Sequence, residues 1–262
     1  MAAAEITSTS NRRIKRLVGL RDRRERDLES VFLIEGPRDI DRALGAGLQA
    51  KEIYYDTARH DACPYPAGLE VGVETAALDR ASYRGRSQGV IAVFGQFPVS
   101  LESLTLKPDA LILMMEAIEK PGNLGAVLRT ADACGADAVI AADPGADPFN
   151  PNVIRASTGA LFTIPVAVTD LEAAVSWLRK RDVIIVAADP VGTTDLWQAD
   201  LTGSRAILVG SEHDGLSEEA RSAADITVSI PMHGAVDSLN TSISAAILAY
   251  EALRQRVGTR RT

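Results

Sequence analysis

The sequence predicts an α/β protein in which a large C-terminal domain, built on a parallel β-sheet with helices on both faces, follows a smaller N-terminal α/β domain. In the C-terminal part, continuous apolar runs bounded by turn residues alternate with segments of helical composition. This pattern is typical of strands buried on both faces of a parallel sheet. Shorter apolar runs alternate with helix-like segments in residues 1–95. A length of 262 residues accommodates two domains of ordinary size.

The composition is that of a globular protein, with 46% hydrophobic and 24% charged residues, and it excludes disordered and collagen-like chains. The only two cysteines, Cys63 and Cys134, lie far apart in the sequence, which excludes a disulfide framework and a Cys-based zinc finger and fits a reducing compartment. The first residues have no apolar signal-peptide core, and no run of about 18 apolar residues follows. We therefore expect a cytoplasmic protein with neither a membrane span nor a bound metal.

The N-terminal domain is expected to span residues 1–95. Pro37 suits the first turn of a helix, where its missing N–H costs nothing. The segment 96–109 is rich in turn residues and lacks periodicity, so it is expected to be a linker. The predicted strands are Val31–Ile34, Ile53–Tyr55, Val71–Val73 and Val90–Phe94, and the predicted helices are Asn11–Leu20, Pro37–Ala46 and Thr75–Tyr83.

The C-terminal domain is expected to span residues 110–262. Its clearest helix is Ser238 to Val257, where apolar residues recur every three or four positions and form one stripe. That stripe either packs on the sheet or forms a subunit interface. Asp237 or Ser238 is expected to cap this helix. The predicted strands are Ala110–Met115, Ala138–Ala142, Phe162–Val168, Val183–Ala188, Ala206–Gly210 and Ile226–Ile230.

The net charge of −7 argues at first against a nucleic-acid partner, because Lys and Arg contacts to phosphates dominate such binding. The charge is unevenly distributed. Residues 1–105 hold 15 basic and 15 acidic side chains, whereas residues 106–262 hold 13 basic and 20 acidic ones. Eight basic and four acidic side chains lie between residues 11 and 30. This basic patch is either an ordinary solvated surface or a contact for nucleic acid.

Three polar segments each follow a predicted strand, where open α/β sheets place their ligand crevice. In the first, Glu116–Gly135, a turn leads into a helix that carries Asn123 near its start and Arg129 one to two turns later. Asn123 is either an N-cap or a functional group, and Arg129 is either a surface ion-pair partner or a functional group.

The second segment is Leu208–Ser217. Gly210 and Gly215 have the spacing of a phosphate-binding loop, but Leu216 stands where that motif requires Lys. The carboxylates of Glu212 and Asp214 would also repel phosphates. A nucleoside triphosphate site is therefore excluded, and a cationic or hydroxyl-rich ligand fits better. His213 is expected to be an exposed loop residue, because no G-x-S-x-G elbow accompanies it.

The third segment, Ile230–Ser244, gathers Ser238, Asn240, Ser242 and Ser244 in the opening turns of the last helix. A single cap needs only one of these side chains, so their concentration favours a functional role. No G-x-G-x-x-G fingerprint occurs after the first strand of the large domain. A nicotinamide dinucleotide site is therefore only weakly supported.

Together the three segments resemble the signature motifs of the SpoU or TrmH family of RNA ribose 2′-O-methyltransferases, within the SPOUT superfamily. Asn152–Ala160 is similar to a further family segment, and the N-terminal domain looks like the family's RNA-binding domain through Asn11–Lys15 and Phe32–Gly36. One departure is His213, where the family usually has Gly. The motif residues are NLGAVLRTADACGA (123–136), ILVGSEHDGLS (207–217) and IPMHGAVDSLNTSISAAI (230–247).

This resemblance implies a trefoil-knotted C-terminal domain, a homodimer formed through that domain and the last helix, and the cofactor S-adenosylmethionine. It implies methylation of a ribose 2′-hydroxyl in structured RNA, with 23S ribosomal RNA favoured by the separate N-terminal domain. The alternatives are a tRNA 2′-O-methyltransferase and a non-catalytic RNA-binding protein that keeps the fold.

The resemblance also assigns residues. By resemblance Arg129 is the central catalytic residue, either as a base or as a phosphate clamp. Because arginine side chains are poor bases, we expect it to clamp phosphate and stabilise the developing alkoxide. Asn123, Glu212, Ser238 and Asn240 are the other predicted catalytic residues and are expected to orient Arg129 and the ribose. The predicted cofactor-binding residues are Gly210, Ile230, Leu239 and Asn240, and the predicted RNA contacts are Arg12, Arg13, Lys15, Arg129 and Arg155.

Overall fold

The computed structural model describes residues 4–118 and 120–259, and the chain divides into two compact units. The first unit comprises Met1–Phe97 together with Phe149–Arg155, and the second comprises Pro98–Pro148 and Ala156–Thr262. The division at Phe97 lies inside the segment expected to be a linker. The inclusion of Phe149–Arg155 in the first unit has no counterpart in the sequence prediction.

The first unit is built on a mixed four-stranded sheet with the order β1-β4-β2-β3. Strand β4 is antiparallel to β1 and β2, whereas β2 and β3 are parallel. Each predicted apolar run lies within a strand: the strands are β1 (Val31–Glu35), β2 (Ala50–Asp56), β3 (Leu69–Val73) and β4 (Val90–Gly95).

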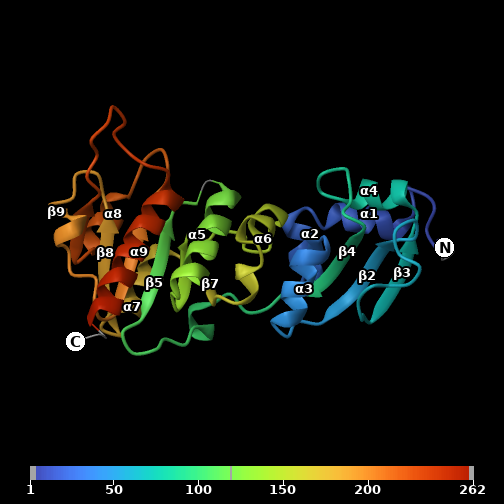
Figure 1. The fold of residues 1–262 in the computed structure, drawn as a ribbon, viewed down its shortest axis with the longest axis horizontal. Coiled ribbons are helices and arrows are strands. Elements are labelled where there is room, and N and C mark those ends of the chain that lie inside the picture. Colours follow the sequence, from blue (N-terminus) through green and yellow to red (C-terminus); the bar gives the residue numbers. More distant parts are fainter. Residues whose placement is uncertain (1–3, 119, 260–262) are drawn as a thin grey trace. The chain divides into compact units, whose positions relative to one another are not determined.

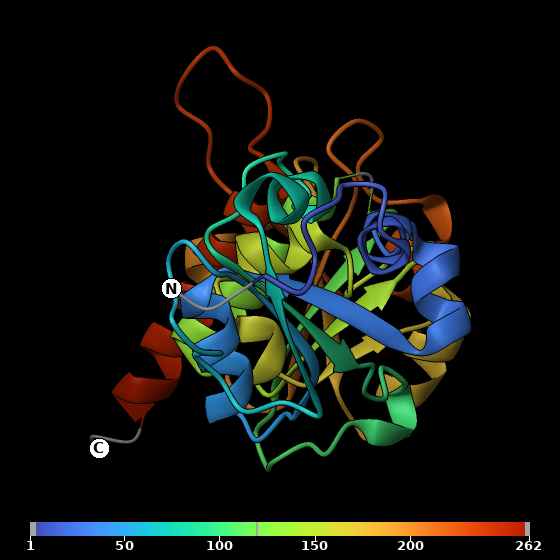
Figure 2. The same cartoon turned by 90° about the vertical axis from the view of Figure 1, so that its right-hand side faces the viewer.

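Helices α1 (Arg12–Gly19) and α4 (Thr75–Ala81) pack on one face of this sheet. Ile14 and Leu17 of α1 are fully buried there against alternate strand residues such as Leu33 and Val93. Helices α2 (Arg23–Glu29) and α3 (Pro37–Gly45) contact β1. Figure 2 turns this unit toward the viewer. Helix α2 was not predicted as a separate helix, because charged residues dominate it.

An aromatic cluster joins the segment Phe149–Arg155 to the first unit. The ring of Phe149 lies 5.0 Å, between centroids, from Phe32 of β1 and 5.0 Å from Phe97. Phe94 of β4 stacks on Phe32 at 5.9 Å. Phe32 and Phe94 are fully buried, so these contacts extend the core of the unit rather than decorate its surface.

The second unit contains a seven-stranded sheet in which every pairing is parallel, with the order β7-β6-β5-β10-β8-β11-β9. The predicted α/β class with a parallel sheet is confirmed. Two details differ: Ala160–Phe162 forms a 3₁₀ turn before β7, and the short β9 was not predicted. The strands are β5 (Leu111–Glu116), β6 (Ala138–Ala142), β7 (Val166–Val168), β8 (Ile184–Ala188), β9 (Thr194–Asp195), β10 (Arg205–Val209) and β11 (Ile226–Ser229).

Helices cover both faces of this sheet (Figure 1). Helices α7 (Leu171–Arg179) and α8 (Glu218–Ala223) pack in one core. Helices α5 (Pro121–Cys134) and α9 (Thr241–Thr259) pack against each other; α5 also contacts β5 and β6, and α9 contacts β5 and β10. Leu101 and Leu104 are buried in the core with α7, so part of the expected linker is structured. The remaining helix is α6 (Pro151–Ser157), and the 3₁₀ turns are Leu101–Ser103, Ala160–Phe162 and Leu196–Gln198.

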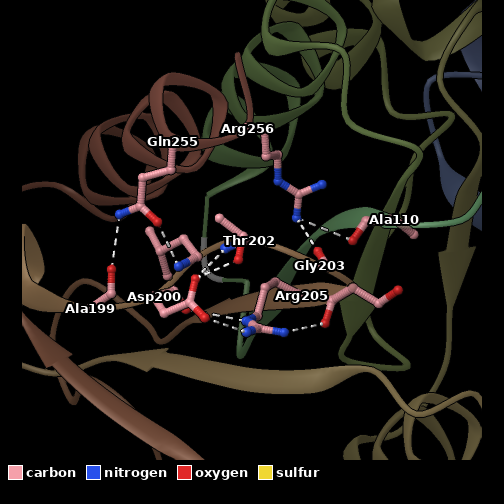
Figure 3. A network of polar contacts seen from close by, with 10 residues as sticks. Ala110, Ala199, Asp200, Thr202, Gly203, Arg205, Gln255 and Arg256 are labelled. Carbon is pink, nitrogen blue, oxygen red and sulfur yellow. Dashed lines mark hydrogen bonds and ion pairs between the residues drawn. The ribbon is translucent and has the colours of Figure 1, made fainter. Parts of the chain in front are cut away.

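The last turns of α9 are fixed to the loops that precede β5 and β10 (Figure 3). Arg256 donates hydrogen bonds to the backbone carbonyls of Asp109, Ala110 and Gly203. Gln255 donates to the Ala199 carbonyl at 2.9 Å and accepts from the Leu201 N–H at 2.8 Å. The C-terminal half of α9 is therefore held by main-chain groups, which sets the position of its N-terminal half. In the part of the chain described, no helix combines the length and apolarity needed to cross a bilayer.

Candidate active site

A cleft of about 710 Å³ opens at the carboxyl ends of β8, β10 and β11. The residues that follow these three strands line it, together with the loop before α9. Its size falls in the range typical of small-ligand sites. Parallel strands place their carboxyl ends at one edge of the sheet, which is where ligands bind in open α/β folds. The sheet topology thus brings together two of the three predicted segments.

Three of the four predicted cofactor-binding residues, Gly210, Ile230 and Leu239, line this cleft. Asn240 is not among the lining residues, although its neighbour Thr241 is. A side chain at Gly210 would place a Cβ 2.2 Å from the backbone of Gly215, so the loop closes only with glycine there. The Thr241 hydroxyl donates to the Gly210 carbonyl at 3.0 Å, which fixes the start of α9 to the end of β10.

The loop between Gly210 and Gly215 is a tight turn. The Ser211 N–H donates to the Gly215 carbonyl at 2.9 Å, and the Asp214 N–H donates to the Ser211 hydroxyl at 2.9 Å. His213 is exposed, as predicted, and is not among the non-glycine residues with positive φ in the described chain. The histidine therefore occupies the family's usual glycine position without a left-handed backbone.

The lining of the cleft is acidic. Four acidic residues and a single arginine line it, namely Asp189, Glu212, Asp214 and Asp237, and Arg221. Arg221 is paired with Asp189 at 2.5 Å. Asp214 and Asp237 are exposed, and their carboxylates make no hydrogen bond or ion pair with any described residue. An acidic cleft with apolar walls such as Ile230 and Leu239 fits a ligand that carries positive charge and a flat apolar group.

Glu212 is the centre of a polar cluster at one end of the cleft. Asn123 of α5 donates from Nδ2 to Glu212 Oε1 at 3.1 Å, and Asn240 donates to the same oxygen. The ammonium group of Lys120 pairs with the other carboxylate oxygen. The hydrogen bond from Lys120 is the largest cause that holds the pKa of Glu212 below its usual range, and the hydrogen bond from Asn123 comes next. The cluster joins residues that are 89 and 28 positions from Glu212 in the sequence.

This cluster changes two of the sequence predictions. The N-cap of α5 is Lys120, so the interpretation of Asn123 as an N-cap is wrong. Helix α9 begins at Thr241, so its predicted start at Ser238 is also wrong. Asn240 accepts a hydrogen bond from the Ser242 N–H at 2.9 Å, the contact that a cap makes, in place of Asp237 or Ser238. Asn240 therefore serves both the helix start and Glu212.

Lys120 was missed in the sequence, where it stands before Pro121 at a helix start and carries no distinctive spacing. Ser238 is exposed and lines the cleft, but it makes no hydrogen bond with the described residues. Among residues 4–118 and 120–259, no group of three or more His, Cys, Asp and Glu side chains could hold a metal ion.

Arg129 lies apart from the Glu212 cluster. It is exposed on α5 and makes no hydrogen bond or ion pair with the described part of the chain. It lines a surface hollow with residues of α9, namely Ser242, Ile243, Ala246, Ile247 and Tyr250. Glu212, Asn123 and Asn240, which are expected to orient Arg129, make no hydrogen bond or ion pair with it within the described chain and are bonded to one another.

The α9 wall of this hollow is apolar and exposed. Ile243 is 50% exposed and Tyr250 is 49% exposed, whereas Leu248 and Ala252 of the same helix are fully buried. Helix α9 thus packs on the sheet through residues such as Leu248 and Ala252, which lie outside the predicted stripe, whereas the stripe residues Ile243 and Tyr250 stay about half exposed. The predicted stripe is therefore not the side of α9 that is buried on the sheet, and its role as a subunit interface stays a prediction.

The basic patch of residues 11–30 separates into two groups. Arg16 is paired with Glu29 and Glu52, and Arg26 is buried with hydrogen bonds to the carbonyls of Leu20 and Arg21. Arg12, Arg13 and Lys15 are exposed on α1 and make no hydrogen bond or ion pair through their side chains within the described residues. The predicted RNA contacts belong to this second group.

Arg155, the remaining predicted RNA contact, belongs to the first unit, whereas Arg129 belongs to the second. Its guanidinium donates to Asn152 Oδ1 at 3.1 Å.

Comparison with known proteins places the chain in a family. Residues 110–250 match the SpoU rRNA Methylase family, and residues 11–92 match the MRM3-like substrate binding domain. The 23S rRNA (uridine(2479)-2′-O)-methyltransferase of Streptomyces viridochromogenes is 33% identical over 99% of this chain and 95% of its own length.

Solved structures agree with this match. The SpoU methyltransferase AviRb of Streptomyces viridochromogenes in complex with the cofactor AdoMet is 29% identical, with a TM-score of 0.86 over 94% of this chain and 98% of that one. A structure described for 2-OH methylation of C/U34 on tRNA is 32% identical but covers only 57% of this chain and 98% of its own, with a TM-score of 0.53. The chain belongs to the SpoU rRNA methylase family.

Proposed function

We propose that this protein transfers a methyl group from S-adenosylmethionine to a ribose 2′-hydroxyl of 23S ribosomal RNA, in the cytoplasm. The observation that carries the proposal is the convergence of three distant segments at one edge of the parallel sheet. Gly210, Ile230 and Leu239 line the cleft, and Glu212 at its end is bonded to Asn123 and Asn240. A family match over residues 110–250 supports the same chemistry.

The extent of the matches favours ribosomal over transfer RNA. The 23S rRNA enzyme matches this chain over 99% of its length, including the N-terminal unit. The structure described for tRNA methylation matches only 57% of this chain and is itself almost fully covered. The whole chain is therefore matched by an rRNA enzyme, whereas about two fifths of it lies outside the match to the structure described for tRNA methylation.

The cleft suits the cofactor. Apolar walls and main-chain groups around Gly210, Ile230 and Leu239 would hold the adenine, and the exposed carboxylates of Asp214 and Asp237 would favour the cationic end. Bound S-adenosylmethionine supplies an electrophilic methyl group on a sulfonium centre. The protein must then position the ribose, and positioning alone contributes up to roughly 7–11 kcal/mol for well-oriented reactants.

We assign the polar residues to that positioning. Glu212, fixed by Asn123, Asn240 and Lys120, has a set orientation at the end of the cleft. Asn123, Asn240 and Ser238 would hold the ribose hydroxyls near it. Arg129 would bind the adjacent phosphate and stabilise negative charge on the 2′-oxygen as its proton leaves.

We further propose that the protein acts as a homodimer. The uncovered apolar side of α9 and the adjacent Arg129 form one surface hollow. A second copy of this chain that covers the apolar side would draw Arg129 to the interface. Arg129 has no partner in its own chain among the described residues, so we assign it to the active site of the partner protomer.

Replacing Ile243 by Asp is expected to convert the dimer to a monomer, because a carboxylate at an apolar interface has no partner and is costly to bury. Methyl transfer should fall with the dimer fraction. Light scattering coupled to size-exclusion chromatography measures the change. Trp197→Asp is the control, since Trp197 is 59% exposed outside this hollow and should leave the mass unchanged. A dimeric Ile243→Asp protein would contradict this interface.

The triple variant Arg12→Ala, Arg13→Ala and Lys15→Ala is expected to bind RNA more weakly. Each lost phosphate contact should lower the slope of log affinity against log salt by roughly 1. Fluorescence anisotropy with an rRNA fragment at several salt concentrations provides both values. An unchanged slope would mean that these three side chains do not contact RNA and belong to an ordinary solvated surface.

The direct test of the function is incubation of the protein with labelled S-adenosylmethionine and total RNA, followed by mapping of 2′-O-methyl stops in primer extension. Label in 23S rRNA at one ribose is the expected result. Label only in tRNA would support the tRNA alternative. Bound cofactor without label in any RNA would support a non-catalytic RNA-binding protein.

A further inference from the structure

The first unit contains a pocket of about 280 Å³ that the methyl-transfer site does not include. The end of β1, the first turn of α3, the loop 83–88 and the segment 151–155 form its walls. All of these belong to one unit, so the pocket is a property of that unit alone. Its volume lies just below the range of drug-sized sites, which suits part of a nucleotide better than a folded segment or a helix.

Four arginines line this pocket: Arg38, Arg84, Arg86 and Arg155. Its two carboxylates are already engaged. Asp39 is paired with Arg38 at 3.0 Å. Glu35 accepts hydrogen bonds from the Ser82 hydroxyl at 2.9 Å and from the Tyr83 N–H at 2.6 Å.

The guanidinium groups of Arg84 and Arg86 make no hydrogen bond or ion pair with the described residues, and both side chains are exposed. Two positive charges therefore remain available at the mouth of the pocket. Guanidinium groups bind phosphate with two parallel hydrogen bonds, so a phosphate diester is the matching ligand group.

The pocket also offers an aromatic ring in a fixed position. Tyr83 is 39% exposed, its N–H is bonded to Glu35, and its hydroxyl accepts a hydrogen bond from Asn152 Nδ2 at 2.9 Å. Asn152 in turn accepts from Arg155 at 3.1 Å. The backbone and the tip of the tyrosine are thus both held. A fixed, partly exposed ring beside free arginines is the combination that stacks an unpaired base.

Gln88 provides a polar group in the lining of the pocket. A Cβ built on Gly36 would lie 2.6 Å from Gln88 Oε1, so the amide packs directly on the Gly36 backbone. Gly36 has φ of +90°, a conformation that also favours glycine. The Gln88 amide thus adds hydrogen-bond donors and an acceptor to the lining of the pocket.

We propose that this pocket binds one unpaired nucleotide of the RNA substrate, with its phosphate on Arg84 and Arg86 and its base stacked on Tyr83. The proposal rests on the proposed function for the identity of the nucleic acid, and it adds a recognition site separate from the ribose that is methylated. A paired nucleotide does not fit, because its base is already stacked in the helix and covered on its pairing edge. The pocket thus selects RNA with an extruded nucleotide over continuous duplex.

The test measures RNA binding directly, apart from methyl transfer. Fluorescence anisotropy compares the full-length protein on two RNAs, a hairpin with a single-nucleotide bulge and the same stem without the bulge. The wild type is expected to bind the bulged RNA at least about fivefold more tightly. Tyr83→Leu should abolish this preference, and Tyr83→Phe should retain it within about twofold, because the ring is kept.

The double variant Arg84→Ala and Arg86→Ala should weaken binding to the bulged RNA at least about tenfold. Lys51→Ala with Arg80→Ala is the matched control. It removes the same charge from exposed sites of the same unit that do not line the pocket, and it should have less than a third of that effect.

Equal losses in the two double variants, or a bulge preference that survives Tyr83→Leu, would overturn the pocket proposal. Methyl transfer by the wild type to total RNA is measured in parallel. Transfer by the wild type with no effect of the pocket variants on binding refutes the pocket alone. Absence of transfer together with a Tyr83-dependent bulge preference refutes the proposed function alone.

Discussion

Replacement of Arg129 by alanine is expected to lower the rate of methyl transfer by about 10²–10³, the usual cost of removing one preorganised group that stabilises developing negative charge. The Kd for S-adenosylmethionine should stay within about twofold of the wild type. Arg129 does not line the cofactor cleft, and its side chain makes no hydrogen bond or ion pair with the described residues. Its loss therefore leaves the cleft of its own protomer intact.

Single-turnover transfer from labelled cofactor to an rRNA substrate measures the rate, and calorimetry measures cofactor affinity. Lys180→Ala, a charge removal at an exposed position outside the cleft and outside the hollow of Arg129, is the matched control and should be silent. An Arg129→Ala protein that loses cofactor binding and keeps full-rate chemistry at saturation would refute the assignment.

The assignment of Arg129 to the partner protomer has its own test. Two impaired variants, Arg129→Ala and Glu212→Gln, are mixed under conditions that exchange subunits. If the two residues serve one site from different chains, a mixed dimer regains one intact site, and about a quarter of the wild-type activity is expected at equal mixing with random exchange. No recovery despite demonstrated exchange would place both residues in the same chain's site.

The sequence predicted the parallel sheet well because its strands are continuous apolar runs whose burial requires no other information. It predicted α2 poorly, since Arg26 reads as a surface charge although it is fully buried on the carbonyls of Leu20 and Arg21. Burial of a charged side chain depends on backbone acceptors that tertiary structure supplies. For the same reason the basic patch looked uniform, whereas Arg16 is held by Glu52, 36 residues away.

The candidate site shows the same limit. The resemblance to the SpoU or TrmH family assigned Asn123, Glu212 and Asn240 to the site, and each of them follows a strand end of the sheet. Spacing could not show that Glu212 would bind Asn123 and Asn240 rather than Arg129, since that choice depends on how α5 and α9 pack. Lys120 was not predicted for a related reason. A lysine at a helix start has no distinctive pattern in the sequence, and its partner Glu212 lies 92 positions later.

Glu212→Gln is expected to lower kcat/KM by at least about tenfold while the protein stays folded. The carboxylate accepts from Asn123, Asn240 and Lys120, whereas a glutamine would turn an NH₂ donor toward one of these donors. At least one of the three donors, Lys120, Asn123 or Asn240, would then lose its acceptor and its fixed orientation. Steady-state kinetics at saturating cofactor, with circular dichroism to confirm folding, measures the effect; wild-type kcat/KM would sink the positioning role.

The pH dependence gives a second, independent reading of the same carboxylate. Lys120 and Asn123 lower the pKa of Glu212, so its charged form is favoured in the folded protein. The contribution of the Glu212 carboxylate to activity is therefore fully present above the usual pKa of a glutamate. It is lost only as the pH falls through the lowered pKa of Glu212. The ratio of wild-type to Glu212→Gln activity should thus stay constant between about pH 5 and 8.

The variant Lys120→Met should move the pKa of Glu212 back toward its usual range. ¹³C NMR of the carboxyl group measures this pKa. An unmoved pKa would mean that Lys120 does not pair with Glu212 in solution.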